Sequence, residues 1–313
     1  MKIILPGGGG HLGTLLAQAF HGQGHEVVVL SRKPSQSAPW RVVGWDGESL
    51  GSWAAEFDGA DAVINLAGRS VNCRYGPKNR ADILQSRLVS TRLVGEAIAR
   101  AAKPPRVWLQ SSTATIYAHR YDAANDEATG TLGCPDPNTP ETWEFSYKVA
   151  WGWERMCTEA PTPHTRKVLM RTSIVLSPMR GQAFDILLTL VKFGLGGRAG
   201  DGRQYVSWLH DRDFVRAVQW LMEHEELSGP VNLASPNPLP NADFMRELRK
   251  AAHIPLGLPA EKWMIEIGSF FLRTESELVL KSRRVAPGRL LASGFQFDFP
   301  TWPVAARDLV SRR

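Results

Sequence analysis

Short apolar runs alternate with amphipathic segments along the first half of the chain. The runs at residues 3–5, 25–30, 41–46, 61–68, 106–112 and 167–176 predict β-strands. Between them, apolar residues recur at helical spacing, over residues 12–20, 80–102 and 142–159. Strands that alternate with helices predict a parallel sheet that is covered by helices on both faces. The fold class is therefore α/β, a doubly wound Rossmann sheet.

The alternation loosens after Ser177. Helices are expected over residues 182–193 and 214–223 and from residue 241, with short strands at 205–210 and 229–234. We predict a Rossmann domain over residues 1–177 and a smaller α/β region on the substrate side over residues 178–313. Some C-terminal elements are expected to return to the first domain. Ligands should bind in a cleft between the two parts, above the carboxyl ends of the strands.

A glycine-rich turn joins the first strand to the first helix. Its spacing fits both Gly8-x-Gly10-x-x-Gly13 and Gly7-x-x-Gly10-x-x-Gly13. A strand, a glycine turn and a helix in this order place a pyrophosphate at the helix N-terminus. Glycine is required because the turn needs a positive φ and because a side chain would block the phosphate. The segment predicts a dinucleotide site.

The residues after the second strand indicate which dinucleotide binds. An NAD site places a carboxylate there to hold the ribose hydroxyls, but this chain has Ser31, Arg32 and Lys33. Arg32 can bind a 2′-phosphate with two parallel hydrogen bonds, and Ser31 can donate a third. We therefore predict NADP(H) as the cofactor. The alternative is that Arg32 and Lys33 merely belong to a solvated loop.

Composition narrows the remaining functions. The 313 residues include 37 Lys and Arg against 31 Asp and Glu, a formal net charge of +6. The cations are scattered, so nucleic-acid binding is not expected. Three cysteines without a Cys-x-x-Cys pair favour a reducing, cytoplasmic setting over disulfides or a metal site. No segment resembles a signal peptide or a membrane span, so we expect no membrane partner.

Several motifs together carry a family resemblance. They are Gly7-x-x-Gly10-x-x-Gly13, Asn65-Leu66-Ala67-Gly68, Ser111-Ser112-Thr113-Ala-Thr-Ile-Tyr117 and Trp208-Leu-His210-Asp211-x-Asp213. With them the chain resembles the extended short-chain dehydrogenase/reductase superfamily. Arg171-Thr172-x-Ile-Val-Leu and the closing Arg284-Val-x-Pro287-x-x-Leu290-x-x-x-Gly294-Phe narrow the resemblance. They look like the subgroup of "epimerase family" proteins that carry a C-terminal domain of unknown function.

The resemblance implies positions for the parts of NADP(H). Gly7, Gly10, His11, Leu12 and Gly13 would line the pyrophosphate, and Ser31, Arg32 and Lys33 would meet the adenosine phosphate. Asp46 would reach the adenine, and Leu66, Ala67 and Gly68 would lie behind the ribose. Ser111, Ser112, Thr113 and Thr172 would flank the nicotinamide. The resemblance also suggests a homodimer packed through the long helices.

The catalytic pattern of the superfamily is broken in this chain. Typical members use a Ser or Thr hydroxyl and a Tyr-x-x-x-Lys pair, in which the Lys lowers the pKa of the Tyr. Thr113 occupies the hydroxyl position, but Trp151 stands four residues after Tyr147. Alignment on a later glutamate instead places Ser146 and Ala150 at the two positions. Thr113 and Tyr147 are the predicted catalytic residues.

Two functions remain open from the residues. One is an NADP(H)-dependent oxidoreductase or nucleotide-sugar-epimerase-like enzyme with a nonstandard active site, acting on an unidentified small molecule with help from Arg203 or His210. The other is a catalytically silent NADP(H) sensor or protein-interaction module. His210 also fits a structural role beside the start of a helix. Arg87 lies on an apolar helix face, where it would either meet a substrate anion or extend past that face to water.

Overall fold

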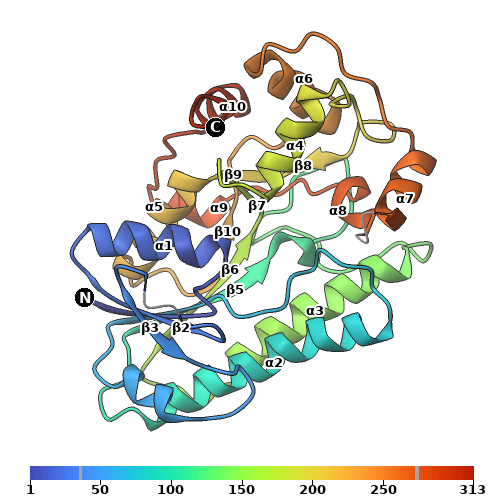
Figure 1. Cartoon of the computed structure of the whole chain (residues 1–313). Helices are drawn as coiled ribbons and strands as arrows, with labels where there is room; N and C mark the ends of the chain where they lie inside the picture. The colour runs from blue at the N-terminus through green and yellow to red at the C-terminus, as the bar shows by residue number, and fades with distance from the viewer. Residues whose placement is uncertain (35–36, 272–274) are drawn as a thin grey trace.

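A seven-stranded sheet forms the centre of the molecule, in a computed structural model that describes residues 1–34, 37–271 and 275–313 (Figure 1). All its strands run parallel, in the order β3-β2-β1-β4-β5-β6-β10. Their bounds are β1 Lys2–Pro6, β2 Glu26–Ser31, β3 Arg41–Gly44, β4 Ala62–Asn65, β5 Val107–Thr113, β6 Arg166–Thr172 and β10 Gly229–Leu233. The order reverses between β1 and β4, which is the switch point where such sheets bind ligands. The predicted fold class is confirmed.

Helices cover both faces of this sheet (Figure 1). Helices α1 (His11–Gly22) and α5 (Asp211–Glu223) pack on one face, against side chains such as Ile3 and Leu5. Helix α2 (Pro77–Arg100) and the end of α3 (Glu141–Thr158) pack on the other face, against Ile4 and its neighbours. Successive strand residues point to opposite faces, and both faces are buried. This explains why the strands are continuous apolar runs.

Some elements of the C-terminal half pack with the central sheet, and others form a second core. Strand β10 completes the central sheet and α5 covers it, so these elements pack with the first domain. The other elements are β7 Ile174–Leu176, α4 Ala183–Lys192, β8 Tyr205–Val206, β9 Trp208–His210, β11 Leu239–Pro240, α6 Asn241–Ala251, α7 Lys262–Phe271, α8 Glu277–Leu280, α9 Gly288–Ala292 and α10 Trp302–Ser311. Short 3-10 helices span Ser52–Phe57 (η1) and Ala114–Ile116 (η2). A second core joins α4, α6, α10 and β9 through Phe184, Phe244, Trp302 and Trp208.

The predicted strand over residues 167–176 is two strands. The Ser173 amide donates to the Leu233 carbonyl, whereas the Ile174 amide donates to that of Ser207. The chain therefore leaves the central sheet at Ser173 and pairs as β7 with β9 in a separate sheet. This crossing connects the two cores.

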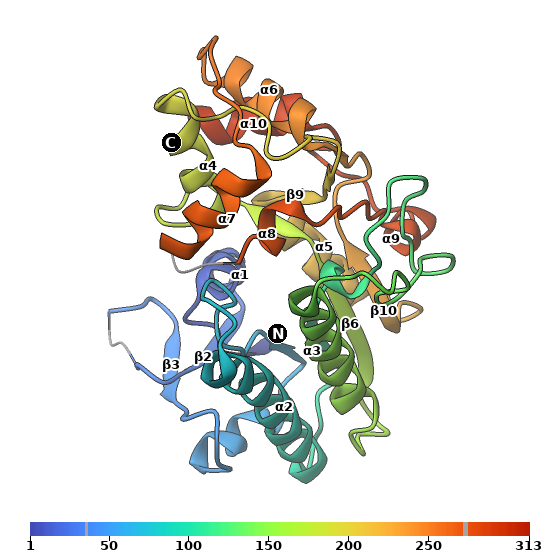
Figure 2. The same ribbon diagram turned by 90° about the vertical axis from the view of Figure 1, so that its right-hand side faces the viewer.

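Helix α8 lies between the C-terminal elements and the central sheet (Figure 2). Two of its residues, Glu277 and Leu278, face the same cavity as the first turn of α1. Of the helices in the described ranges, none combines the length and the apolar character that crossing a bilayer requires.

Candidate functional site

The glycine turn packs too closely for side chains at three of its positions, Gly7, Gly8 and Gly13. Gly7 has φ +74°, and a Cβ there would lie 2.6 Å from Cα of Ala67. A Cβ on Gly13 would lie 2.3 Å from Cα of Gly8. At Gly10 the space is open, because the nearest atom to such a Cβ is the Gly7 carbonyl oxygen at 3.9 Å. The turn is therefore tight within itself and open toward a ligand.

A cavity of about 500 Å³ begins at this opening. Gly7, Gly10, His11, Leu12 and Gly13 line it, as predicted for a pyrophosphate site. No side chain caps the N-terminus of α1 among the described residues, and such an end attracts anions. His11 forms a hydrogen bond of 2.6 Å with Ser177, and burial lowers the pKa of its imidazole. His11 is therefore neutral at physiological pH, so it adds a dipole but no charge.

The predicted adenosine-phosphate residues lie outside the cavity, at the carboxyl end of β2. Arg32 and Lys33 are exposed, and the Ser31 hydroxyl accepts a hydrogen bond from the Lys33 amide at 3.2 Å. Ser31 also lies beside the glycine turn, 3.0 Å from where a Cβ of Gly9 would stand. The group is open to solvent and close to the cavity mouth.

Asp46 is engaged by its own loop. Its carboxylate accepts hydrogen bonds from the Glu48 and Ser49 amides and from the Ser49 hydroxyl, which lowers the pKa of Asp46 to about 2. Its predicted contact with the adenine stays a prediction.

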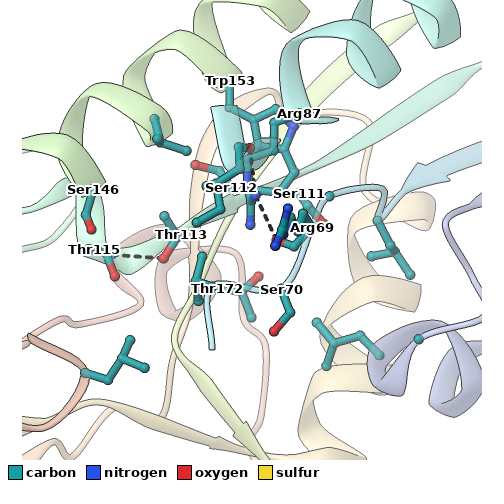
Figure 3. Close-up of a pocket in the computed structure, with 18 of the residues that line it drawn as sticks. Arg69, Ser70, Arg87, Ser111, Ser112, Thr113, Thr115, Ser146, Trp153 and Thr172 are labelled. Carbon is teal, nitrogen blue, oxygen red and sulfur yellow. Dashed lines mark hydrogen bonds between the residues drawn. The ribbon is translucent and has the colours of Figure 1, made fainter. Parts of the chain in front are cut away.

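Residues after β4 and β5 form the middle of the cavity. Leu66 and Gly68 line it, whereas Ala67 lies behind Gly7 and does not reach the cavity. Ser111, Ser112, Thr113 and Thr172 also line it, from the ends of β5 and β6 (Figure 3). The Thr113 hydroxyl accepts a hydrogen bond of 3.1 Å from the Thr115 amide, so it keeps its proton to donate.

The hydroxyl of Ser112 is held by a buried ion pair. It donates to Glu154 at 2.5 Å, and Glu154 accepts two hydrogen bonds of 2.8 Å from Arg171. Arg171 donates onward to the hydroxyl of Tyr117, which donates to Asn232. This network holds the side chain of Ser112, which lines the cavity.

Helix α3 presents Ser146, not Tyr147, to the cavity. Ser146, Val149 and Trp153 line it, at spacings that fall on one helix face. Tyr147 is one residue on, about 100° around the helix, and packs against Tyr117 and its neighbours. Tyr147 is therefore not placed to act on a ligand in this cavity. Of the two residues that the alternative alignment places at the Tyr and Lys positions, Ser146 lines the cavity, whereas Ala150 packs in the cluster that contains Tyr117 and Tyr147.

The C-terminal region supplies a carboxylate that the sequence did not indicate. Glu277 accepts a hydrogen bond of 2.6 Å from the Ser146 hydroxyl, and only 1% of its surface is exposed. Its other oxygen, Oε1, has no hydrogen-bond partner among the described residues and lies 3.7 Å from Arg283 and 3.8 Å from Lys281. Ser146 and Glu277 are 131 residues apart, so no local pattern could reveal their contact.

Tyr75 lines the same end of the cavity. Burial and the nearby Glu277 carboxylate raise the pKa of Tyr75 to about 12, although its hydrogen bond with Ser146 opposes this shift. The phenol therefore stays protonated at neutral pH. It can donate a hydrogen bond but is a weak acid.

Arg203 and His210 lie away from the cavity. The Arg203 guanidinium lies over the ring of Tyr121, 5.6 Å from its centroid. His210 caps α5, stacks on Phe299 and forms a hydrogen bond of 3.0 Å with Asp308. Neither residue is among those that line the cavity, so the structural role predicted as the alternative for His210 agrees with its position.

Comparison with known proteins identifies the family. The model of the NAD dependent epimerase/dehydratase family matches residues 3–234. The chain belongs to this family. A domain of unknown function, DUF1731, matches residues 262–309, which include Glu277 and Arg283. The epimerase/dehydratase fold and the domain of unknown function together confirm the resemblance found in the sequence.

Relatives of similar length come from distant organisms. Epimerase family protein SDR39U1 of Homo sapiens is 29% identical over 314 residues, covering 99% of this chain and 100% of that protein. Epimerase family protein YfhF of Bacillus subtilis is 29% identical over 315 residues, covering 100% and 99%. A crystal structure of human SDR39U1 with NADPH matches with a TM-score of 0.87 and 28% identity, covering 100% of both chains.

Among the described residues, no group of three or more His, Cys, Asp and Glu side chains is placed to hold a metal ion.

Proposed function

We propose that this protein binds NADP(H) in the cavity and exchanges a hydride with a small molecule held between Thr113, Ser146 and Glu277. One observation carries the proposal: the uncapped N-terminus of α1 and the open side of Gly10 begin a continuous cavity that reaches these groups. The crystal structure of the relative SDR39U1 with NADPH supports the same cofactor here.

NADP(H) is favoured over NAD(H) by the charges beyond β2. Ser31, Arg32 and Lys33 offer a hydroxyl and two exposed cations, whereas an NAD site requires a carboxylate acceptor at this point. A 2′-phosphate carries the charge that these groups complement.

When bound, the cofactor would supply hydride transfer at its nicotinamide ring. The protein must then move a proton. In the oxidising direction, a substrate hydroxyl would lose its proton to Ser146 as the Ser146 proton passes to Glu277 along their 2.6 Å hydrogen bond. The hydride leaves the same carbon for NADP⁺. The reverse sequence reduces a carbonyl group, and the two in succession at one carbon give epimerisation when the hydride returns to the opposite face of the carbonyl.

A silent NADP(H) sensor is the second candidate. It is favoured by the pKa of about 12 at Tyr75, since this tyrosine cannot act as a near-neutral acid. A sensor would bind NADPH without consuming it, and its partner or oligomeric state would respond to the cofactor.

Calorimetric titration with NADPH and NADH tests the cofactor proposal. We expect NADPH to bind more tightly, and Arg32→Ala to reduce the ratio of the two affinities by about tenfold or more. The matched control is Arg106→Ala. Arg106 is exposed and precedes Val107, the first residue of β5, so it lies at the amino ends of the strands, opposite the predicted phosphate site at the carboxyl end of β2. Equal affinities in the wild type, or an unchanged ratio in Arg32→Ala, would refute the proposal.

Turnover distinguishes the enzyme from the sensor. The protein is incubated with NADPH and a panel of carbonyl compounds and keto sugars, and the loss of NADPH absorbance is followed. Consumption that disappears in Thr113→Ala supports the enzyme. Tight NADPH binding without consumption across the panel favours the sensor.

A further inference from the structure

Arg87 is a buried cation in the cavity wall. It comes from α2, lines the cavity and is only 9% exposed. Its Nη1 donates to the carbonyl oxygens of Arg69 and Ile83, both at 3.0 Å. Its guanidinium lies over the ring of Trp153, 4.8 Å from the centroid (Figure 3). Of the two alternatives for Arg87, the one in which it lines the cavity agrees with its position, and the one in which it extends past the apolar face to bulk water does not.

The charge of Arg87 is not balanced by a carboxylate. Within the described ranges it forms no ion pair, and its Nε and Nη2 donate no hydrogen bond. Burial lowers the pKa of Arg87 to about 10, so the side chain remains charged at neutral pH. Buried charges in proteins are normally paired or fully hydrogen-bonded. The unused N–H groups of this planar fork are available to a ligand.

The position of Arg87 indicates which part of a ligand it would meet. Its Cζ lies 3.2 Å from where a Cβ of Gly68 would stand, so the guanidinium packs close to the chain after β4. Gly68 follows Ala67, which packs against Gly7, so the glycine turn lies on one side of Arg87. On the other side lies Ser112, with Thr113 beyond it (Figure 3). A dinucleotide with its pyrophosphate on α1 and its nicotinamide at Thr113 must place its second ribose between them.

We propose that Arg87 binds the nicotinamide-side ribose of NADP(H), donating hydrogen bonds from Nε and Nη2 to the ribose hydroxyl oxygens. This inference rests on the proposed function and assigns one further part of the same site. It differs from substrate-anion recognition, because the contact is made to the cofactor with no substrate present.

Calorimetric titration with three ligands of increasing size, each of which contains the one before, tests the inference. 2′,5′-ADP contains only the adenosine half, 2′-phospho-ADP-ribose adds the pyrophosphate and second ribose, and NADPH adds the nicotinamide. We expect Arg87→Gln to weaken NADPH and 2′-phospho-ADP-ribose by about 10- to 100-fold, as hydrogen bonds from a charged group predict. The affinity for 2′,5′-ADP should stay within about twofold and shows that the variant is folded. Arg32→Ala is the comparison variant and should weaken all three ligands.

Other results would overturn the inference. It is wrong if Arg87→Gln binds NADPH as tightly as the wild type, or if the affinities for all three ligands fall by the same factor. If Arg87→Gln does not fold, Arg87→Lys carries the test, since lysine keeps the charge but lacks the planar fork; unchanged NADPH affinity then refutes it. A wild type that binds none of the three ligands instead refutes the proposed function, and the inference fails with it.

Discussion

Gly10→Ala should separate cofactor binding from folding. A methyl group at this position would have one neighbour within 4 Å among the described residues, the Gly7 carbonyl oxygen at 3.9 Å. The backbone at Gly10 has φ −88°, which any residue can adopt. The added methyl group therefore clashes with none of the described residues, but it occupies the space through which a phosphate must approach α1.

The two expected effects differ in size. Alanine is a poorer N-cap than glycine, and the change should lower the free energy of unfolding by about 1 kcal/mol or less. Displacing a phosphate from the helix N-terminus removes hydrogen bonds to a charged group, worth about 1.5–3 kcal/mol each. Loss of two such bonds weakens NADPH binding by about 100-fold or more, because about 1.4 kcal/mol corresponds to a factor of ten.

The assay combines calorimetric titration of NADPH with urea unfolding of the same samples. Gly22→Ala is the matched control, because it makes the same change at the far end of α1, where a Cβ would meet nothing within 4 Å. Its NADPH affinity should equal that of the wild type. Gly13→Ala should instead lose stability, since its Cβ would lie 2.3 Å from Gly8. Wild-type NADPH affinity in a folded Gly10→Ala protein would refute the phosphate site.

Two further predictions concern buried groups. Glu154→Gln leaves the buried Arg171 cation without its carboxylate, so the free energy of unfolding in urea should fall by about 3–5 kcal/mol; a loss below about 1 kcal/mol would contradict this. Burial lowers the pKa of His11 below its ordinary value of 6.5, so the unfolded chain takes up the proton at a higher pH than the folded protein does. The stability that neutral His11 contributes is fully present above pH 6.5 and is lost as the pH falls toward the folded pKa. His11→Asn should reduce the slope of stability against pH in that window, measured by urea unfolding, and an unchanged slope would show that His11 is not the titrating group.

The central sheet was predictable because its strands are short, apolar and separated by amphipathic helices. The glycine turn was predictable because its spacing lies within one strand-turn-helix unit, in which Gly13 packs on Gly8 of the same turn. The prediction was wrong where one predicted strand serves two sheets. Residues 168–170 and 174–176 are apolar and close together in the sequence, but the hydrogen bond of Ser173 to Leu233 and that of Ile174 to Ser207 depend on distant strands.

The far end of the cavity was not predictable, because its groups come together only in the tertiary structure. A shift of one residue on α3 turns the side chain by about 100°, which exchanges Tyr147 for Ser146 at the cavity. Apolar periodicity cannot resolve this choice when both neighbours suit a helix. Glu277 lies in the C-terminal region, and its role becomes visible only from its contact with Ser146.

The cluster around Glu277 brings the region matched by DUF1731 to the cavity. Glu277 and Lys281 are each 1% to 2% exposed, and Arg283 lies beside them. Removing these charges from water opposes folding, and their separations of 3.7–3.8 Å offset that only in part. A cluster that served stability alone would be better replaced by apolar side chains. Its unpartnered carboxylate oxygen and its hydrogen bond to Ser146 instead make it suited to accept a proton or a hydroxyl group. The carboxylate thus comes from α8, and the buried cation in the cavity wall comes from α2.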